Sequence, residues 1–146
     1  MERGSGSARP GHIGSGLSIG QIQWAIAAVF FVLGGWALLA PRSVIALTLL
    51  PEYRTGTPIL PFAVACFGAQ AMISGLFAAF SRFTRATFLA YGIALLPFFV
   101  FNWWFTFVDP VFTWLGLLEA AGNVVMLALC VIGWRKAAAA EERAHA

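Results

Sequence analysis

The sequence predicts an all-α, polytopic membrane protein, an antiparallel bundle of four transmembrane helices. Three observations predict this fold. Hydrophobic residues make up 60% of the 146 residues and charged residues only 10%, and the mean hydropathy is +0.83, whereas a soluble domain carries about 25% charge. Four apolar segments are each long enough to cross a bilayer. Lipid offers no water to backbone groups, so segments of this length must be helices.

The four segments cover residues 21–40, 58–80, 86–108 and 111–134, and together they hold 90 residues and one charge, Glu119. At 1.5 Å per residue, 20 to 24 residues span roughly 30–36 Å, which matches a hydrocarbon core of about 30 Å. Residues 1–20 contain six Gly and four Ser and are predicted to form a flexible cytoplasmic tail. Residues 135–146 are predicted to form a C-terminal cytoplasmic tail that continues the last helix.

The distribution of Lys and Arg predicts the orientation. Seven of these residues lie on the side of the two termini and only Arg42 and Arg54 on the other side. Because cytoplasmic loops are enriched in positive charge, we expect both termini in the cytoplasm and the chain in the cell inner membrane. The seven residues are Arg3, Arg9, Arg82, Arg85, Arg135, Lys136 and Arg143.

The connections between segments predict which helices are neighbours. Residues 81–85 and the Asp109-Pro110 turn are short, so the second, third and fourth helices are expected to be antiparallel neighbours. Ser43–Leu50, in the longer first loop, is apolar and predicts a short helix on the outer surface or over the bundle mouth. Ala71, Gly75 and Ala79 form a stripe of small residues, which favours close helix packing within the bundle or between two copies.

The sequence also excludes several kinds of site. Its two histidines, His12 and His145, lie in the tails, so histidine cannot build a haem or zinc site inside the bundle. Neither a cofactor nor a metal is predicted, and without a basic stripe neither is nucleic acid. Cys66 and Cys130 differ by about 16 Å in predicted depth, which is too far for a disulfide.

Five residues at membrane depth are the candidate ligand-binding residues: Cys66, Gln70, Asn102, Glu119 and Asn123. Counted from the outer helix ends at 1.5 Å per residue, Asn102 lies about 9 Å deep, Cys66 and Glu119 about 12 Å, and Gln70 and Asn123 about 18 Å. Two polar layers are therefore predicted. The nearby segment Phe98–Phe107 has seven aromatic residues in ten, which either line an outer cavity or face lipid.

Glu119 has two interpretations. An ionisable residue at this depth costs about 2.5–3.5 kcal/mol on insertion scales and is by default a functional candidate. Alternatively, a protonated Glu119 bonded to Asn102 or Asn123 simply holds helices together, at about 0.6 kcal/mol per bond. Both interpretations stay open at this point.

The layout resembles that of small DoxX-like bacterial membrane proteins, which are mostly uncharacterised. The residues that carry the resemblance are Leu39-Ala40-Pro41, Phe67-Gly68-Ala69-Gln70-Ala71, and the polar pair Glu119 and Asn123. It covers about residues 20–135. Some members of that group are tied to respiratory or redox complexes, so the resemblance implies the fold more than an activity.

The sequence favours a non-enzymatic accessory or interaction protein that binds a lipid or hydrophobic small molecule in an outward-facing pocket. Its predicted partners are membrane lipid, that small molecule, and a membrane-protein partner or a second copy of the chain. One alternative is a small transporter or proton-coupled carrier that uses Glu119. Another is a membrane redox partner or enzyme that uses Cys66 with Glu119, although no nucleophile–base pair is evident.

Overall fold

The computed structural model describes residues 17–145, and this part of the chain is helical with a single isolated β-bridge. Four of its helices are long and apolar enough to cross a membrane. The predicted all-α four-helix bundle is confirmed, and the chain is a multi-pass membrane protein. The elements are α1 (Ile19–Leu39), α2 (Pro41–Thr48), the 3-10 turn η1 (Pro51–Tyr53), α3 (Ile59–Phe80), α4 (Arg85–Trp103), the π-helical turn η2 (Trp104–Val108) and α5 (Leu117–His145).

The first and last helices differ in their bounds from the prediction. Ser18 and Gln21 form a capping box, so α1 begins at Ile19, inside the predicted tail; residues 1–16 of that tail lie outside the described residues. The last helix begins at Leu117 rather than at residue 111, because the backbone before it pairs with residues near the end of α2. It then runs without a break to His145, as expected of an alanine-rich segment with high helix propensity.

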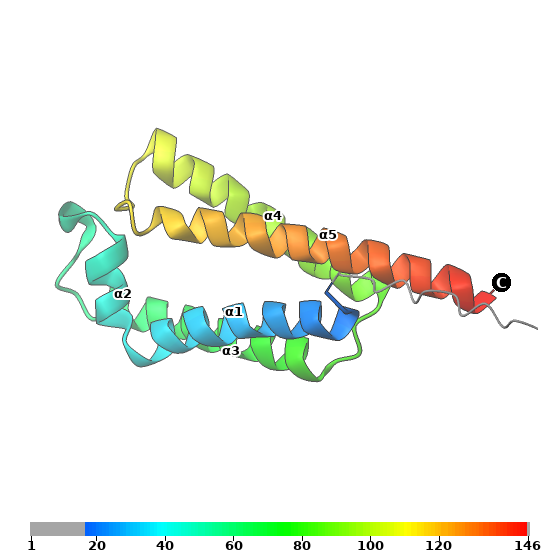
Figure 1. Cartoon of the computed structure of the whole chain (residues 1–146). Coiled ribbons are helices and arrows are strands. Elements are labelled where there is room, and N and C mark those ends of the chain that lie inside the picture. The colour runs from blue at the N-terminus through cyan, green and yellow to red at the C-terminus, as the bar shows by residue number, and fades with distance from the viewer. Residues whose placement is uncertain (1–16, 146) are drawn as a thin grey trace, which may run out of the picture.

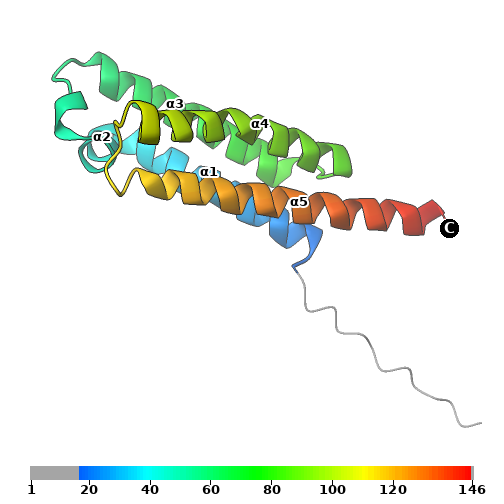
Figure 2. The same ribbon diagram turned by 90° about the horizontal axis from the view of Figure 1, so that it is seen from above.

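The four long helices form two pairs, α1 with α3 and α4 with α5 (Figures 1 and 2). Around the bundle the order is α1, α3, α4, α5. The Tyr91 hydroxyl donates to the Ser74 carbonyl at 3.0 Å and so connects α4 to α3, while α5 packs beside α1. We call the end where α1 begins and α5 finishes the terminal end, and the opposite end the α2 end.

The buried core lies mainly towards the terminal end. Ile22, Ile26, Phe88 and Cys130 are its largest fully buried side chains, and Ala78 joins them from the last turns of α3. In Figure 1 the two helix pairs converge at the terminal end and diverge towards α2. The outer faces carry bare hydrophobic side chains, such as Phe77 at 65% exposed, as expected of surface that contacts lipid.

Glycines bring α1 and α3 into close contact. A Cβ atom added at Gly68 would overlap the backbone nitrogen of Leu38 and lie 2.7 Å from the Gly34 carbonyl oxygen. One added at Gly75 would lie 3.1 Å from Phe30 and Phe31. The small-residue stripe on α3 therefore packs on α1, within the chain.

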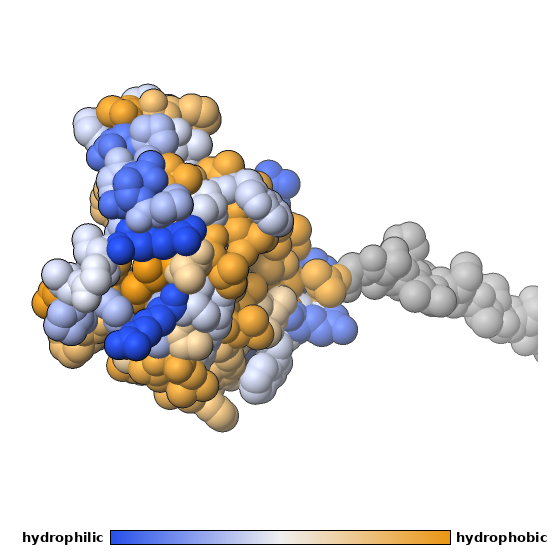
Figure 3. Space-filling model, turned by 90° about the vertical axis from the view of Figure 1, so that its left-hand side faces the viewer, coloured by the Kyte–Doolittle hydropathy of each residue, from blue (hydrophilic) through white to orange (hydrophobic). Residues whose placement is uncertain are grey.

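A backbone connection closes the α2 end, and we call it the α2 clasp: residues 47–50 paired with residues 111–113. Leu50 N donates to the Val111 carbonyl at 2.9 Å, and Thr113 N donates to the Thr48 carbonyl at 2.9 Å. The Thr113 hydroxyl donates to the Leu47 carbonyl at 2.6 Å. The predicted short helix is thus present and tied to the α4–α5 connection. Figure 3 looks onto this end, where hydrophilic residues gather beside hydrophobic ones.

Replacing Gly68 with alanine should lower the free energy of unfolding by about 1–3 kcal/mol, since overpacking a tight contact has this cost. The added methyl meets the α1 backbone, which moves only if the helices separate. Unfolding of the purified protein in mixed micelles measures the effect. Gly35→Ala is the matched control, because its methyl has only the flexible Met72 sulfur nearby, at 3.7 Å. Equal stability of the two variants would contradict the prediction.

The loops at the α2 end should show a pH-dependent contact. The Tyr53 hydroxyl donates to Asp109 Oδ1 at 3.1 Å, and this hydrogen bond, with smaller contributions from burial and from the charges of Asp109 and Glu52, raises the pKa of Tyr53 above 10.0. A raised folded-state pKa means that the contact stabilises the fold below the unfolded-state pKa, and that this contribution disappears as the pH rises through the folded-state pKa.

Titration of phenolate absorbance in a Tyr91→Phe background isolates Tyr53, because the chain has two tyrosines. Asp109→Asn should lower the titration midpoint towards that of free tyrosine. Glu52→Gln, the control, should lower it less, since the Glu52 charge is the smallest of the causes. An unchanged midpoint in Asp109→Asn would rule out the contact.

Candidate functional site

The five candidate residues lie on three helices. Cys66 and Gln70 are on α3, Asn102 is near the end of α4, and Glu119 and Asn123 are in the first two turns of α5. Asn102 is buried and Asn123 half-buried, whereas the other three are exposed in the isolated chain. The two asparagines are therefore the candidates that the fold encloses.

Cys66 and Gln70 lie on the face of α3 that α1 does not cover. The opposite face packs on α1 through Gly68, Ala71 and Gly75, and the spacing of 3.6 residues per turn turns Cys66 and Gln70 away from it. Gln70 contributes its backbone carbonyl to a hydrogen bond from the Ser74 hydroxyl at 3.0 Å. These two side chains thus face the surroundings of the bundle rather than its interior.

Asn102 and Glu119 lie at a similar height along the bundle axis. Gly92 of α4 lies against Cys130 and Leu127 of α5. Continuing this antiparallel register by ten residues places Asn102 level with Ala120, which is next to Glu119. Asn123 lies one turn further along α5. The three polar residues of α4 and α5 therefore occupy neighbouring levels in the half of the bundle near α2.

Two polar atoms in this region are buried without a hydrogen-bond partner among the described residues: Asn102 Oδ1 and Asn123 Nδ2. The other amide atom of Asn102, Nδ2, donates to the Phe98 carbonyl at 2.8 Å. Neither unpartnered atom is bonded to Glu119, so the structure does not contain the predicted interhelical bonds at these atoms. An unsatisfied buried group costs about 1–3 kcal/mol, and such groups are rare enough in native proteins to need an explanation.

Sequence reasoning missed the role of Gln23 on α1. Its amide Nε2 lies 2.8 Å from the Ala78 carbonyl, 3.2 Å from that of Ala79 and 2.8 Å from that of Ser81. These carbonyls belong to the end of α3, where the last turn of a helix leaves acceptors unpaired. Gln23 therefore caps α3 from a neighbouring helix, which no local pattern in the sequence indicates.

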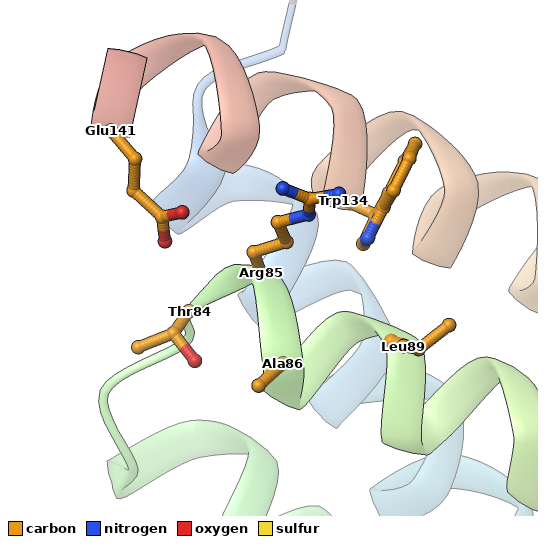
Figure 4. A pocket seen from close by; sticks show the side chains of 6 residues that line it. All are labelled: Thr84, Arg85, Ala86, Leu89, Trp134 and Glu141. Carbon is orange, nitrogen blue, oxygen red and sulfur yellow. The ribbon is translucent and has the colours of Figure 1, made fainter. Parts of the chain in front are cut away.

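Sequence reasoning also missed two cavities at the terminal end. One, of about 360 Å³, is lined by Thr84, Arg85, Ala86, Leu89, Trp134 and Glu141 (Figure 4). Its Arg85 guanidinium lies 4.7 Å from the centre of the Trp134 ring, a cation–π contact. A second cavity, of about 350 Å³, lies between the start of α1 and α5. The basic residues next to Trp134 in the sequence were the signal that could have indicated these cavities.

The two cysteines are free; Cys66 is exposed and Cys130 buried. Cys66 on α3 and Glu119 on α5 come from helices that lie diagonally across the bundle, which does not favour a joint reactive site. Within residues 17–145, no three His, Cys, Asp or Glu side chains gather closely enough to hold a metal ion.

The chain was compared with family models, with curated proteins and with solved structures, and none of them matches it. The resemblance to DoxX-like proteins therefore stays a prediction.

Proposed function

We propose that this chain is a non-enzymatic membrane protein that binds a lipid or a hydrophobic small molecule against the polar side of α4 and α5. The observation that carries the proposal is the pair of buried, unpartnered atoms, Asn102 Oδ1 and Asn123 Nδ2. One accepts a hydrogen bond and the other donates one. A bound molecule with a polar group would satisfy both and remove the cost of leaving them unpaired.

The expected ligand is mostly apolar with one compact polar group. A hydroxyl both donates and accepts, so it fits an asparagine oxygen and an asparagine amide at neighbouring levels. The apolar part suits the surroundings, since Phe98 and Phe99 precede Asn102 on α4. Glu119, at the level of Asn102, adds a third polar group on the same helix pair.

The buried core is distributed unevenly along the bundle, which supports placing the ligand towards the α2 end. The two helix pairs bury their shared core towards the terminal end, whereas the asparagines lie towards the α2 end. There the two pairs are joined by the loop backbone of the α2 clasp and by the Phe67 and Phe98 rings, whose centroids lie 6.4 Å apart. Ligand sites in helical bundles are commonly built in this way, from side chains on facing helices.

The proposal includes the cell inner membrane as the location, with both termini in the cytoplasm. Seven basic residues against two on the opposite side support this orientation. It also includes membership of the DoxX-like group and an accessory role beside a membrane-protein partner or a second copy. The exposed polar side chains of Cys66 and Gln70 on α3 support a contact with such a partner, because polar groups facing lipid favour helix association.

The double variant Asn102→Leu with Asn123→Leu tests ligand binding. The wild-type protein, purified from its membrane in mild detergent, should retain a hydrophobic molecule that native mass spectrometry detects. The double variant should lose it, because both hydrogen-bonding side chains are gone. Gln70→Leu is the matched control: it makes a similar change at membrane depth on the exposed face of α3, and it should retain the molecule.

Thermal unfolding of the same three proteins separates ligand binding from a structural role. The double variant removes two unpartnered polar atoms and one hydrogen bond, from Asn102 Nδ2 to a carbonyl of its own helix. These effects oppose each other, so the ligand-free stability should be about equal. A wild-type protein without a bound molecule, or a double variant that keeps the molecule, would refute the proposal. So would a double variant with reduced ligand-free stability, because the asparagines would then serve the fold.

A further inference from the structure

A basic cavity of about 350 Å³ opens at the terminal end, between the start of α1 and the last turns of α5. Its charged lining consists of Arg135, Lys136 and Arg143, with no carboxylate among the lining residues. Like charges brought together in this way repel one another, so the arrangement favours binding of an anion.

Helical spacing on α5 produces the cavity. Arg135, Ala139 and Arg143 follow one another at four-residue intervals, as do Lys136 and Ala140, and residues four apart lie on the same face. The alanines have only methyl groups, so the space between the basic side chains stays open. Because α5 continues as a helix to His145, this arrangement is fixed rather than left to a loop.

The start of α1 forms the other wall of the cavity. Ser18 and Ile19 line it, and the capping box holds them in place: Ser18 N donates to Gln21 Oε1 at 2.8 Å and Gln21 N donates to the Ser18 hydroxyl at 3.2 Å. The beginning of a helix carries partial positive charge. It therefore adds to the charge of the three basic side chains of α5.

The cavity lies at the membrane boundary. The apolar stretch of α5 ends at Trp134, and Arg135 and Lys136 follow at once. Tryptophan is enriched at the level of lipid headgroups, and Trp24 near the start of α1 is 55% exposed there. Arg135 and Lys136 thus meet the layer that contains lipid phosphates, and Arg143 lies two turns further along the same face of α5.

We propose that this cavity binds the phosphate group of an anionic phospholipid from the leaflet at the terminal end. Basic pockets between transmembrane helices suit such headgroups. The two arginines contribute planar, bidentate donors for phosphate oxygens, and Lys136 a compact charge. The sequence before Leu17 contains one acidic residue, Glu2, against Arg3 and Arg9, so it does not supply a competing acidic segment. This site is separate from the one proposed at Asn102 and Asn123.

The test compares lipid binding by the full chain. Phosphatidylglycerol is added to the delipidated protein in detergent, phosphatidylcholine with the same acyl chains serves as reference, and native mass spectrometry counts bound lipid. Arg135→Gln, Lys136→Gln and Arg143→Gln should each weaken phosphatidylglycerol binding about fivefold, the effect of one basic side chain near an anionic lipid surface. Arg82→Gln is the matched control; it removes one positive charge at the same end but outside the cavity, and it should change little.

Ala140→Glu gives a second, independent arm, because it adds a carboxylate to the lining while keeping every basic residue. It should abolish the preference for phosphatidylglycerol, and glutamate is tolerated in a helix. Unchanged binding in these variants would overturn the proposal, as would an equal loss in Arg82→Gln, which would indicate general surface charge. Binding of inorganic phosphate with the same residue dependence but without a lipid preference would also overturn it, in favour of a free-anion site.

Discussion

The contact between Gly34 of α1 and Gly68 of α3 is the constraint on which the rest of the structure depends. Only glycine lets the two backbones approach this closely, since a methyl at Gly68 would meet the main chain of α1. Helices in lipid gain little from hydrophobic burial and associate largely by such close packing. Once α1 and α3 form one unit, Gln23 reaches the last carbonyls of α3. The buried side chains of α4 and α5 then have a fixed surface to pack against.

The packing of α4 and α5 against α1 and α3 is uneven along the bundle, and this unevenness determines where the buried polar residues lie. Phe88 and Cys130 fill the core towards the terminal end, and the α2 clasp ties the opposite end through backbone hydrogen bonds. Between these two regions Asn102 and Asn123 are enclosed by helices but left with unpaired atoms. A fully packed bundle would pair or exclude such groups. Their presence is the observation that supports the proposed binding role.

The fold could be predicted from the sequence because a long apolar segment in lipid satisfies its backbone hydrogen bonds by forming a helix. The predicted start of the last helix was wrong because long-range contacts determine where that helix begins. Val111 and Thr113 pair with residues about sixty positions earlier, and local hydropathy carries no information about such pairs. For the candidate site, the predicted depth in the membrane identified Asn102 and Asn123, since a polar residue among apolar ones is visible in the sequence. Spacing grouped Cys66 with Gln70 on one face but could not show that the glycines opposite them would turn that face outward.

The α2 clasp has a consequence for biogenesis. It joins residues on either side of two complete helices, so its two halves are made at well-separated times during synthesis. Leu50 leaves the ribosome long before Val111, and its amide has no clasp partner until α4 has crossed the bilayer. Closure of the clasp therefore reports that both α3 and α4 have crossed the bilayer. A chain that stalls after α3 carries an open loop with unpaired backbone groups, a difference that quality-control proteases could recognise.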